Sequence, residues 1–151
     1  MNPIYGRRIR QLDSANHQTM TATLASMELT ASQGHILTFI AHAPVPPCPK
    51  DMEEAFHLSH PTVSGLLSRL EKKGFIRIDP DPADRRCKRV SLDAKGRECL
   101  AKMEATITSN EAKLVQNFTE EEKALFADLL SRAITNLGGS PCRPIFKEES
   151  D

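Results

Sequence analysis

The hydrophobic pattern is clearest in the middle of the chain, where it predicts a short amphipathic helix. Val63, Leu66, Leu67 and Leu70 are spaced at i, i+3, i+4 and i+7, so they share one face of a helix with 3.6 residues per turn. The opposite face is small, hydroxyl-bearing and basic, and it carries no carboxylate: Pro61, Thr62, Ser64, Gly65, Ser68, Arg69 and Lys72. Small side chains permit close approach to DNA, hydroxyls can bond bases or phosphates, and a guanidinium can pair with a guanine edge.

The ends of this helix are also marked in the sequence. Ser59 suits the N-cap, and Pro61 suits the first turn, where backbone N–H groups have no partner within the helix. Gly74 suits the position after the C-cap, and Lys72 and Lys73 complement the negative end of the helix dipole. We therefore expect a helix between Ser59 and Gly74.

A β-hairpin is predicted directly after this helix. Residues 75–79 and 87–92 have the pattern of strands, and the polar segment 80–86 between them is rich in turn-forming residues. Arg85 or Arg86 at its tip can enter a narrow minor groove, where the negative potential is enhanced. An amphipathic helix or a basic hairpin alone is usually a solvated surface, but the two in this order predict a winged helix.

The preceding segments predict three further helices. Residues 6–27 are weakly amphipathic, and Thr30 and Gln33 match a capping box for a second helix. A rigid, extended connection follows, which is indicated by Pro44, Pro46, Pro47 and Pro49. Residues 50–57 suit a short helix whose core side is expected to be Met52, Ala55 and Phe56. This short helix and the Ser59 helix would form a helix-turn-helix.

Two long helices are predicted after the hairpin. Asp93 can cap a helix to about Asn117, and Thr119 begins a second capping box for a helix that ends at Gly138. We expect one mainly α domain over 1–139, with end helices at about 6–27 and 94–137, a DNA-binding lobe at about 30–92, and a loosely held tail at 140–151.

The end helices carry more apolar surface than a small winged domain can cover. We expect them to pack against the same helices of a second copy, which would make the protein a homodimer. The alternative is that they fold back on their own chain.

Charge is unevenly distributed, although the net charge is zero. Residues 58–102 have a clear excess of Lys and Arg, while residues 1–57 and 103–151 are net negative. A basic middle fits a focused phosphate-binding face, although a charge run can also be only a solvated surface. There is no long apolar run or secretion signal, so the sequence predicts no membrane association and a cytoplasmic location.

Other chemistries find little support in the sequence. The four cysteines, Cys48, Cys87, Cys99 and Cys142, form no CxxC pair, and the five histidines form no HExxH pattern. There is no glycine-rich phosphate loop and no nucleophile motif. We therefore expect no enzymatic activity, no metal and no cofactor.

In order and spacing, these motifs resemble those of the MarR family of bacterial winged helix-turn-helix regulators. The resemblance covers roughly residues 29–137 and rests on the segments 29–33, 58–64, 69–76, 79–86 and 90–96. It implies a cytoplasmic homodimer that represses or otherwise regulates transcription from a near-palindromic operator. It also implies that Asp84 braces the wing and that Arg86 reaches the minor groove.

The resemblance further implies that a small aromatic or anionic effector controls DNA affinity. Its hypothetical lining is Met20, Met27, His35, Phe39 and Met103, although ordinary core packing explains these residues better. The redox-responsive members of the family use a cysteine near the first helix, and this chain has none before Cys48. Cys87, on the wing, can still affect DNA binding if it is oxidised.

The predicted DNA-binding residues fall in two groups. The helix contributes Ser59, His60, Pro61, Thr62, Ser64, Gly65, Ser68, Arg69 and Lys72, and the wing contributes Asp84, Arg85, Arg86 and Lys88. Thr62, Ser64 and Arg69 are expected at base edges or adjacent phosphates, and Ser59, His60, Ser68 and Lys72 at the DNA backbone. A winged helix that binds protein rather than DNA, and a redox-responsive regulator, are the alternative hypotheses.

Overall fold

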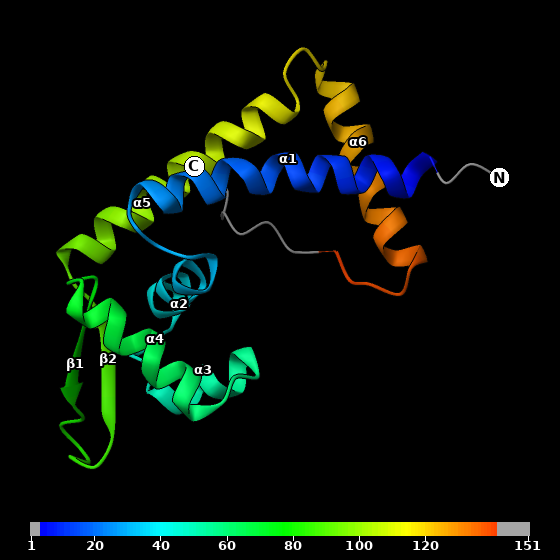
Figure 1. Cartoon of the computed structure of the whole chain (residues 1–151). Coiled ribbons are helices and arrows are strands. Elements are labelled where there is room, and N and C mark those ends of the chain that lie inside the picture. Colours follow the sequence, from blue (N-terminus) through cyan, green and yellow to red (C-terminus); the bar gives the residue numbers. More distant parts are fainter. Residues whose placement is uncertain (1–3, 142–151) are drawn as a thin grey trace, which may run out of the picture. The chain divides into compact units, whose positions relative to one another are not determined.

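The computed structural model describes residues 4–141, which form helices and one two-stranded antiparallel sheet (Figure 1). The elements are α1 (Ile4–Ser26), α2 (Ala31–His42), α3 (Pro49–Phe56), α4 (His60–Lys72), β1 (Ile76–Pro80), β2 (Lys88–Leu92), α5 (Ala94–Leu114) and α6 (Glu120–Asn136). This confirms the expected mainly α, winged-helix fold. No helix within residues 4–141 combines the length and hydrophobicity needed to span a membrane.

The chain divides into two compact units, Met1–Asn110 and Glu111–Asp151. The first unit contains the helix-turn-helix, the wing, α1 and most of α5, and the second contains the end of α5 and all of α6. Most of the tail expected at 140–151, including Cys142, lies outside the described residues. The prediction of one domain over 1–139 stays a prediction.

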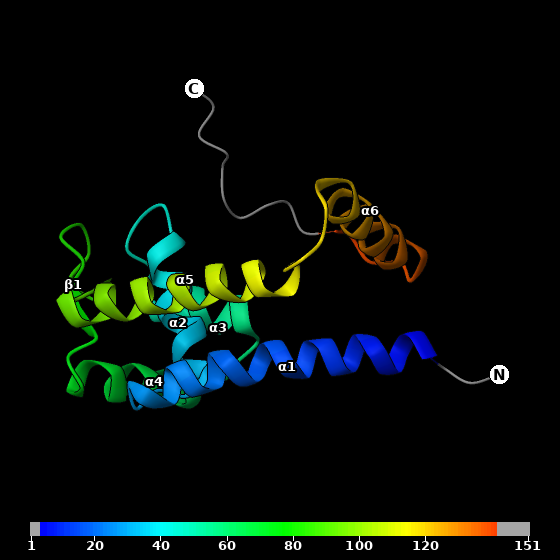
Figure 2. The ribbon, with the colours of Figure 1, turned by 90° about the horizontal axis from the view of Figure 1, so that it is seen from above.

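The core of the first unit is built from the stripes that the sequence predicts. Val63, Leu67 and Leu70 of α4 are buried, and Leu66 packs against the same core. They are joined by residues of α2, α5 and the hairpin, including Ile36, Leu37, Phe75, Val90 and Leu100. Figure 2 shows α2 and α4 close to one another in this unit. The face of α4 that could contact DNA is therefore fixed by what its other face buries.

The predicted core side of α3 is correct for two of its three residues. Met52 is fully buried and Phe56 packs edge-on against Phe39, with ring centroids 5.4 Å apart. Ala55 is exposed, so its assignment to the core is wrong. In a helix of only eight residues, one short side chain is too little signal to fix the width of the apolar face.

Helix ends are specified mainly by local hydrogen bonds. Thr30 and Gln33 form the predicted capping box of α2, and Thr119 and Glu122 form that of α6. Ser59 takes the extended N-cap conformation at the start of α4, but its side chain does not cap the helix. At the other end, Gly74 has a φ of 79°, which is the left-handed conformation expected after the C-cap.

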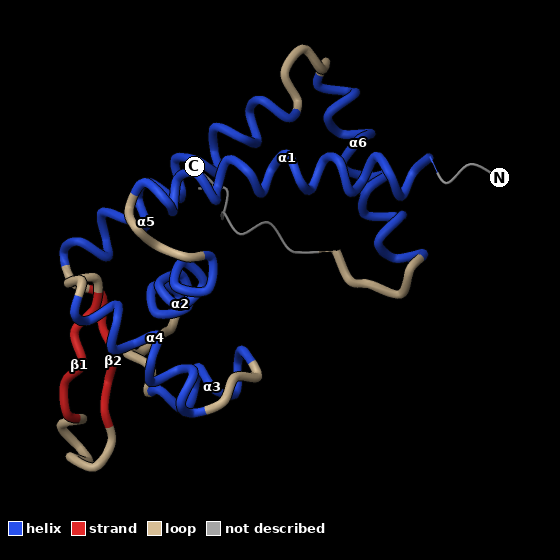
Figure 3. Tube along the Cα trace, in the orientation of Figure 1, coloured by secondary structure: helices blue, strands red, loops and turns tan. Residues whose placement is uncertain are grey.

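The wing is an antiparallel pair in which Ile76 lies opposite Leu92 and Pro80 opposite Lys88 (Figure 3). A third segment joins it, because the backbone N–H of Val90 donates to the carbonyl oxygen of Pro47 at 2.9 Å. The proline-rich α2–α3 loop therefore runs along the inner edge of the hairpin. Proline has no N–H, so this loop can accept hydrogen bonds from β2 at Pro46 and Pro47 but cannot return them there.

Polar contacts tie α1 to α5 within the first unit. The Asn110 amide donates to the side-chain oxygen of Asn16 at 2.9 Å, and the hydroxyls of Thr23 and Thr106 lie 2.9 Å apart. Asn110 lies on α5 in line with the apolar residues Met103 and Ile107, and these contacts give its amide a partner on α1.

Candidate nucleic-acid interface

The polar face of α4 is open to solvent over its whole length. Gly65 is half-buried, and the other eight predicted helix residues are exposed. Nothing lies within 4 Å of where a Cβ on Gly65 would be, so the fold itself does not require glycine there. The absence of a side chain at Gly65 keeps the helix surface low at the centre of this face.

A groove of about 690 Å³ lies between α3, α4 and the wing. It brings together five of the predicted residues from two elements: His60, Ser64, Ser68, Arg86 and Lys88. The remaining predicted residues of α4 and of the wing turn do not line this groove. Helix hydroxyls and wing cations thus face a shared space, which is what contact with one DNA phosphate backbone requires.

The groove is less purely basic than the pattern of α4 predicts. Glu71 of α4 and Glu53 of α3 both line it. The Glu71 carboxylate accepts a hydrogen bond from the backbone N–H of Ile78 at 3.2 Å, so it ties α4 to β1. Glu53 lies 2.6 Å from Nδ1 of His60. Each carboxylate therefore has a partner within the protein.

The start of α4 has a different arrangement from a standard cap. The hydroxyls of Ser59 and Thr62 lie 2.8 Å apart and bond each other. The Ser59 side chain therefore does not satisfy the first N–H groups of α4, which remain oriented toward solvent. This end of the helix carries the partial positive charge of the helix dipole.

Five predicted cations have no partner for their side chains among residues 4–141: Arg69, Lys72, Arg85, Arg86 and Lys88. All five are exposed. Some other cations of the same unit are paired, such as Arg77, whose Nε lies 2.8 Å from the Asp79 carboxylate. The cations that the sequence assigned to DNA are therefore all free to bind a phosphate.

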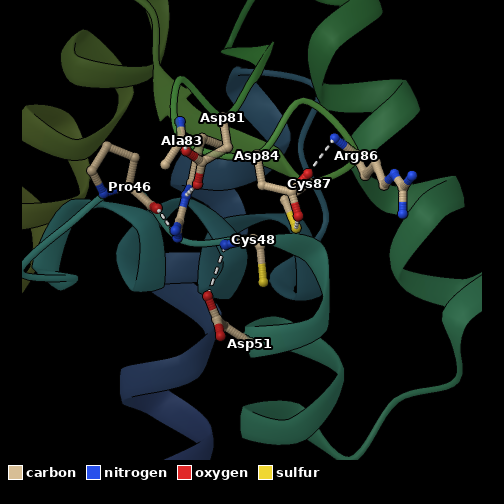
Figure 4. Close-up of polar contacts among 9 residues, drawn as sticks. Pro46, Cys48, Asp51, Asp81, Ala83, Asp84, Arg86 and Cys87 are labelled. Carbon is tan, nitrogen blue, oxygen red and sulfur yellow. Dashed lines mark hydrogen bonds and ion pairs between the residues drawn. The ribbon is translucent and has the colours of Figure 1, made fainter.

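The turn of the wing is held by its own carboxylates, as Figure 4 shows. Asp84 Oδ1 accepts from the backbone N–H of Arg86 at 3.0 Å, a contact that supports its expected bracing role. The same carboxylate lies beside the thiol of Cys87, with Sγ 3.7 Å from Oδ2. Its negative charge, followed by desolvation, raises the pKa of the Cys87 thiol.

The sequence analysis missed a second pair that holds the wing. Arg89 Nε donates to Asp81 Oδ2 at 2.6 Å, and Nη1 donates to the carbonyl oxygen of Pro46 at 3.1 Å. The backbone N–H of Ala83 and then the Arg89 guanidinium lower the pKa of Asp81. Asp81 directly follows β1 and Arg89 lies on β2, so this pair could not be inferred before the register of the hairpin was known.

A second pocket, of about 300 Å³, lies away from the DNA-binding face. It is lined by the end of α1, by Phe75 and by the first half of α5, and Lys95 Nζ lies 4.5 Å from the centre of the Phe75 ring. Only Met27 of the hypothetical effector-lining residues reaches this pocket. Met20, Phe39 and Met103 belong to or pack against the core, and His35 is exposed.

Metal and thiol chemistry have no assembled site in the part of the chain that the structure describes. No group of three or more His, Cys, Asp or Glu residues between 4 and 141 is arranged to hold a metal ion. Cys48, Cys87 and Cys99 are free thiols, and burial raises the pKa of Cys99. Asp51 accepts from the backbone N–H of Cys48 at 2.8 Å, which is the main cause of its lowered pKa.

Comparison with known proteins agrees with this architecture. The family model described as MarR family matches residues 29–88. The regulator PecS of Dickeya dadantii is 26% identical over 122 residues, which cover 80% of this chain and 74% of PecS. The regulator HosA of Escherichia coli is 32% identical over 71 residues, or 47% of this chain. For HosA, as for YwaE of Bacillus subtilis, the chain spans about half of the relative's length.

Solved structures match over a larger share of the chain. The DNA complex of MepR from Staphylococcus aureus has a TM-score of 0.78 at 26% identity, and the match covers 88% of this chain and 99% of that one. A MepR structure described as a regulator of the multidrug efflux pump MepA has a TM-score of 0.79 at 27% identity, with coverage of 88% and 98%. The chain resembles both of these MepR structures over most of its length.

Proposed function

Because the chain belongs to the MarR family of transcriptional regulators, we propose that it binds specific sites in duplex DNA with α4 and its wing. The observation that supports this most is the groove in which the hydroxyls of α4 face unpaired wing cations. A partner with closely spaced phosphates matches that arrangement. Because the proposed partner is chromosomal DNA, we also propose a cytoplasmic location.

Within this proposal, each group of residues has a distinct role. Thr62, Ser64 and Arg69 contact base edges in the major groove, while Pro61 and Gly65 allow the helix to approach closely. Ser59, His60, Ser68 and Lys72 contact the phosphate backbone and fix the register. Arg85, Arg86 and Lys88 extend the contact along the wing, and Asp84 supports its turn through the Arg86 amide.

We further propose that the protein acts as a homodimer through its end helices. On α1, Ile4, Tyr5, Ile9 and Leu12 are exposed. On α6, no residue is buried, and Leu125, Leu129 and Ile134 are exposed. Two copies related by a two-fold axis would place their α4 helices about one DNA turn apart, roughly 34–36 Å, on a near-palindromic operator.

An effector site is proposed at the pocket beside Phe75. Lys95 and Lys102 line it together with Glu28 and Glu98, and Lys95 covers the buried Phe75 ring. The lining is therefore mixed in charge, and the small aromatic or anionic ligand is proposed from the family resemblance. Binding there would change DNA affinity only if the ligand favours one position of α4 over another. A repressor that responds to a ligand is the form of regulation we propose.

The redox-responsive alternative is weaker than the DNA-binding proposal. Asp84 raises the pKa of Cys87, and a thiol held in its protonated form reacts slowly with oxidants. The alternative of a protein-binding module is weakened by the unpaired cations, because rim lysines and arginines contribute less to a protein interface than to DNA. We propose that this protein has no enzymatic activity and uses neither a metal nor a cofactor.

The deciding experiment is selection of bound duplexes from a random pool, followed by titration of the selected duplex at several salt concentrations. We expect a near-palindromic sequence and an affinity that falls steeply with salt, with a log–log slope of about −0.9 for each phosphate contacted. Failure to enrich any sequence, together with no binding to duplex DNA at low salt, would refute the proposal.

A further inference from the structure

The side chain of Arg89 joins the wing to the loop that enters the helix-turn-helix. Its guanidinium donates to Asp81, at the start of the wing turn, at 2.6 Å, and to the carbonyl oxygen of Pro46, in the α2–α3 loop, at 3.1 Å. These two acceptors are 35 residues apart in the chain, so one planar group bridges distant segments. The geometry suits arginine, which presents several donors in one rigid fork.

Asp81 is the buried acceptor in this bridge. It is one of two buried polar residues found within residues 4–141, and only 8% of it is exposed. Its carboxylate also accepts from the backbone N–H of Ala83 at 2.7 Å, and its own N–H donates to the carbonyl oxygen of Cys87 at 2.9 Å. Figure 4 shows Asp81, Ala83 and Pro46 gathered beside the wing turn. Asp81 therefore sets the geometry of both ends of the turn.

The loop on the other side of the bridge is stiff. Pro47 is buried and accepts from Val90, and the next residue, Cys48, bonds Asp51 in the first turn of α3. Since proline rings fix φ, the loop has little freedom to follow a moving wing. Arg89 and Val90 therefore fix the direction of the wing relative to the α2–α3 loop and, through this loop, relative to α3.

We propose that Arg89 is a positioning residue that holds Arg86 in the orientation needed for DNA, and that Arg89 itself does not contact DNA. The inference rests on the proposed DNA-binding function. Arg89 is half-buried, and its Nε and Nη1 donate to Asp81 and Pro46, whereas the side chain of Arg86 is exposed and unpaired among the described residues. If the bridge is lost, only a fraction of molecules presents Arg86 correctly, and apparent affinity falls by that fraction.

The test compares four variants on the duplex that the wild-type protein selects from a random pool. Arg86→Ala should lower the slope of log K against log salt by about 1, because one phosphate contact is lost. Arg89→Gln should weaken binding on the order of tenfold with an unchanged slope, if the competent wing position falls to roughly a tenth of the population. Arg77→Gln is the matched control, because it removes an exposed ion pair of the same hairpin, and it should bind like wild type.

The double variant Arg86→Ala/Arg89→Gln separates positioning from a general loss of structure. If Arg89 acts through Arg86, the double variant should bind no more weakly than Arg86→Ala alone. Additive losses, a reduced salt slope in Arg89→Gln, or unchanged affinity in a folded Arg89→Gln would each overturn the inference. Should Arg89→Gln fail to fold, Arg89→Lys keeps the charge but cannot reach Asp81 and Pro46 together, and the same outcomes apply to it.

A measurement without DNA keeps this inference distinct from the proposed function. Amide hydrogen exchange at Ala83 and Cys87 should be faster in Arg89→Gln than in wild type and unchanged in Arg77→Gln. Unchanged exchange would overturn the positioning role even if DNA binding is intact. Absence of DNA binding by wild type would instead refute the proposed function, whatever the exchange result.

Discussion

At the scale of single residues, Arg69 is the clearest candidate for sequence-specific contact. It is exposed on α4, and its guanidinium has no partner among residues 4–141. Arg69→Ala should weaken binding to the selected duplex by roughly 1–3 kcal/mol while leaving binding to unrelated duplex less affected, because a bidentate guanine contact is lost. Competitive titration at fixed salt measures both quantities. Equal losses on specific and unrelated DNA would assign Arg69 to the phosphates instead.

The thiol of Cys87 provides a residue-scale test of wing electrostatics. The Asp84 carboxylate raises the pKa of Cys87, so at neutral pH the reactive thiolate is less populated than in a free cysteine. Asp84→Asn should therefore speed alkylation of Cys87 by iodoacetamide. Peptide mass spectrometry measures the fraction of Cys87 that is labelled over time. Asp79→Asn is the control in the same hairpin and should leave the rate unchanged. Slower labelling in Asp84→Asn would contradict the assignment.

Residue roles were predictable where they depend on local spacing, and not where they depend on tertiary register. The capping residues Thr30 and Thr119 follow from a four-residue pattern, and the structure confirms both. Ser59 is at the predicted position but bonds Thr62, because two hydroxyls in one turn can satisfy each other. The Asp81–Arg89 pair became visible only with the strand pairing, since eight residues separate its members across a turn.

At the scale of elements, two helical glycines predict opposite effects of the same substitution. A Cβ on Gly96 of α5 would overlap the carbonyl oxygen of Phe75, whereas a Cβ on Gly65 of α4 meets nothing within 4 Å. Gly65→Ala should therefore raise the free energy of unfolding by up to about 1 kcal/mol through helix propensity. Gly96→Ala should lower it by about 1–3 kcal/mol or more, because backbone must move.

Chemical denaturation of the two glycine variants measures both changes, and each variant serves as the control of the other. If both variants gain stability, the close packing of α5 on the junction between α4 and β1 is incorrect. The same contact explains why α5 begins where it does, since the Asp93 N–H also bonds the Phe75 carbonyl oxygen at 3.0 Å.

Element types and order were predictable from the sequence, but the hydrogen bonding between the α2–α3 loop and β2 was not. Every helix and both strands lie within a few residues of their predicted positions, because hydrophobic period and caps are local signals. The α2–α3 loop was predicted only as extended and rigid. Its pairing with Val90 depends on long-range packing, which has no period in the sequence.

At the scale of the whole molecule, the exposed apolar faces of the end helices predict the oligomeric state. Leu12→Glu on α1 and Leu129→Glu on α6 should each shift the protein toward monomer, because a charge would be buried in the dimer interface. Sedimentation velocity measures the change. Ala41→Glu, on an exposed position of α2, is the control and should leave the mass unchanged. Wild type that sediments as a monomer would refute the proposed dimer.

The distribution of charge also belongs to this scale. The chain has no net charge, yet its middle segment is basic and its flanks are acidic. Composition alone would therefore give no reason to expect a nucleic-acid partner. The family assignment and the regulator class follow from the order of motifs, whereas the operator and any effector cannot be read from one chain, since they depend on DNA sequence and ligand chemistry outside it.

The strand-like loop of prolines beside β2 has a practical consequence for exchanging parts between relatives. A hairpin transplanted alone would arrive without Pro46 and Pro47, the carbonyl acceptors for Arg89 and Val90. The natural module for a chimera is therefore discontinuous, made of residues 44–49 together with residues 76–92. Grafts that respect this pairing should keep the recipient's DNA affinity, while grafts of the hairpin alone should fold and yet bind more weakly.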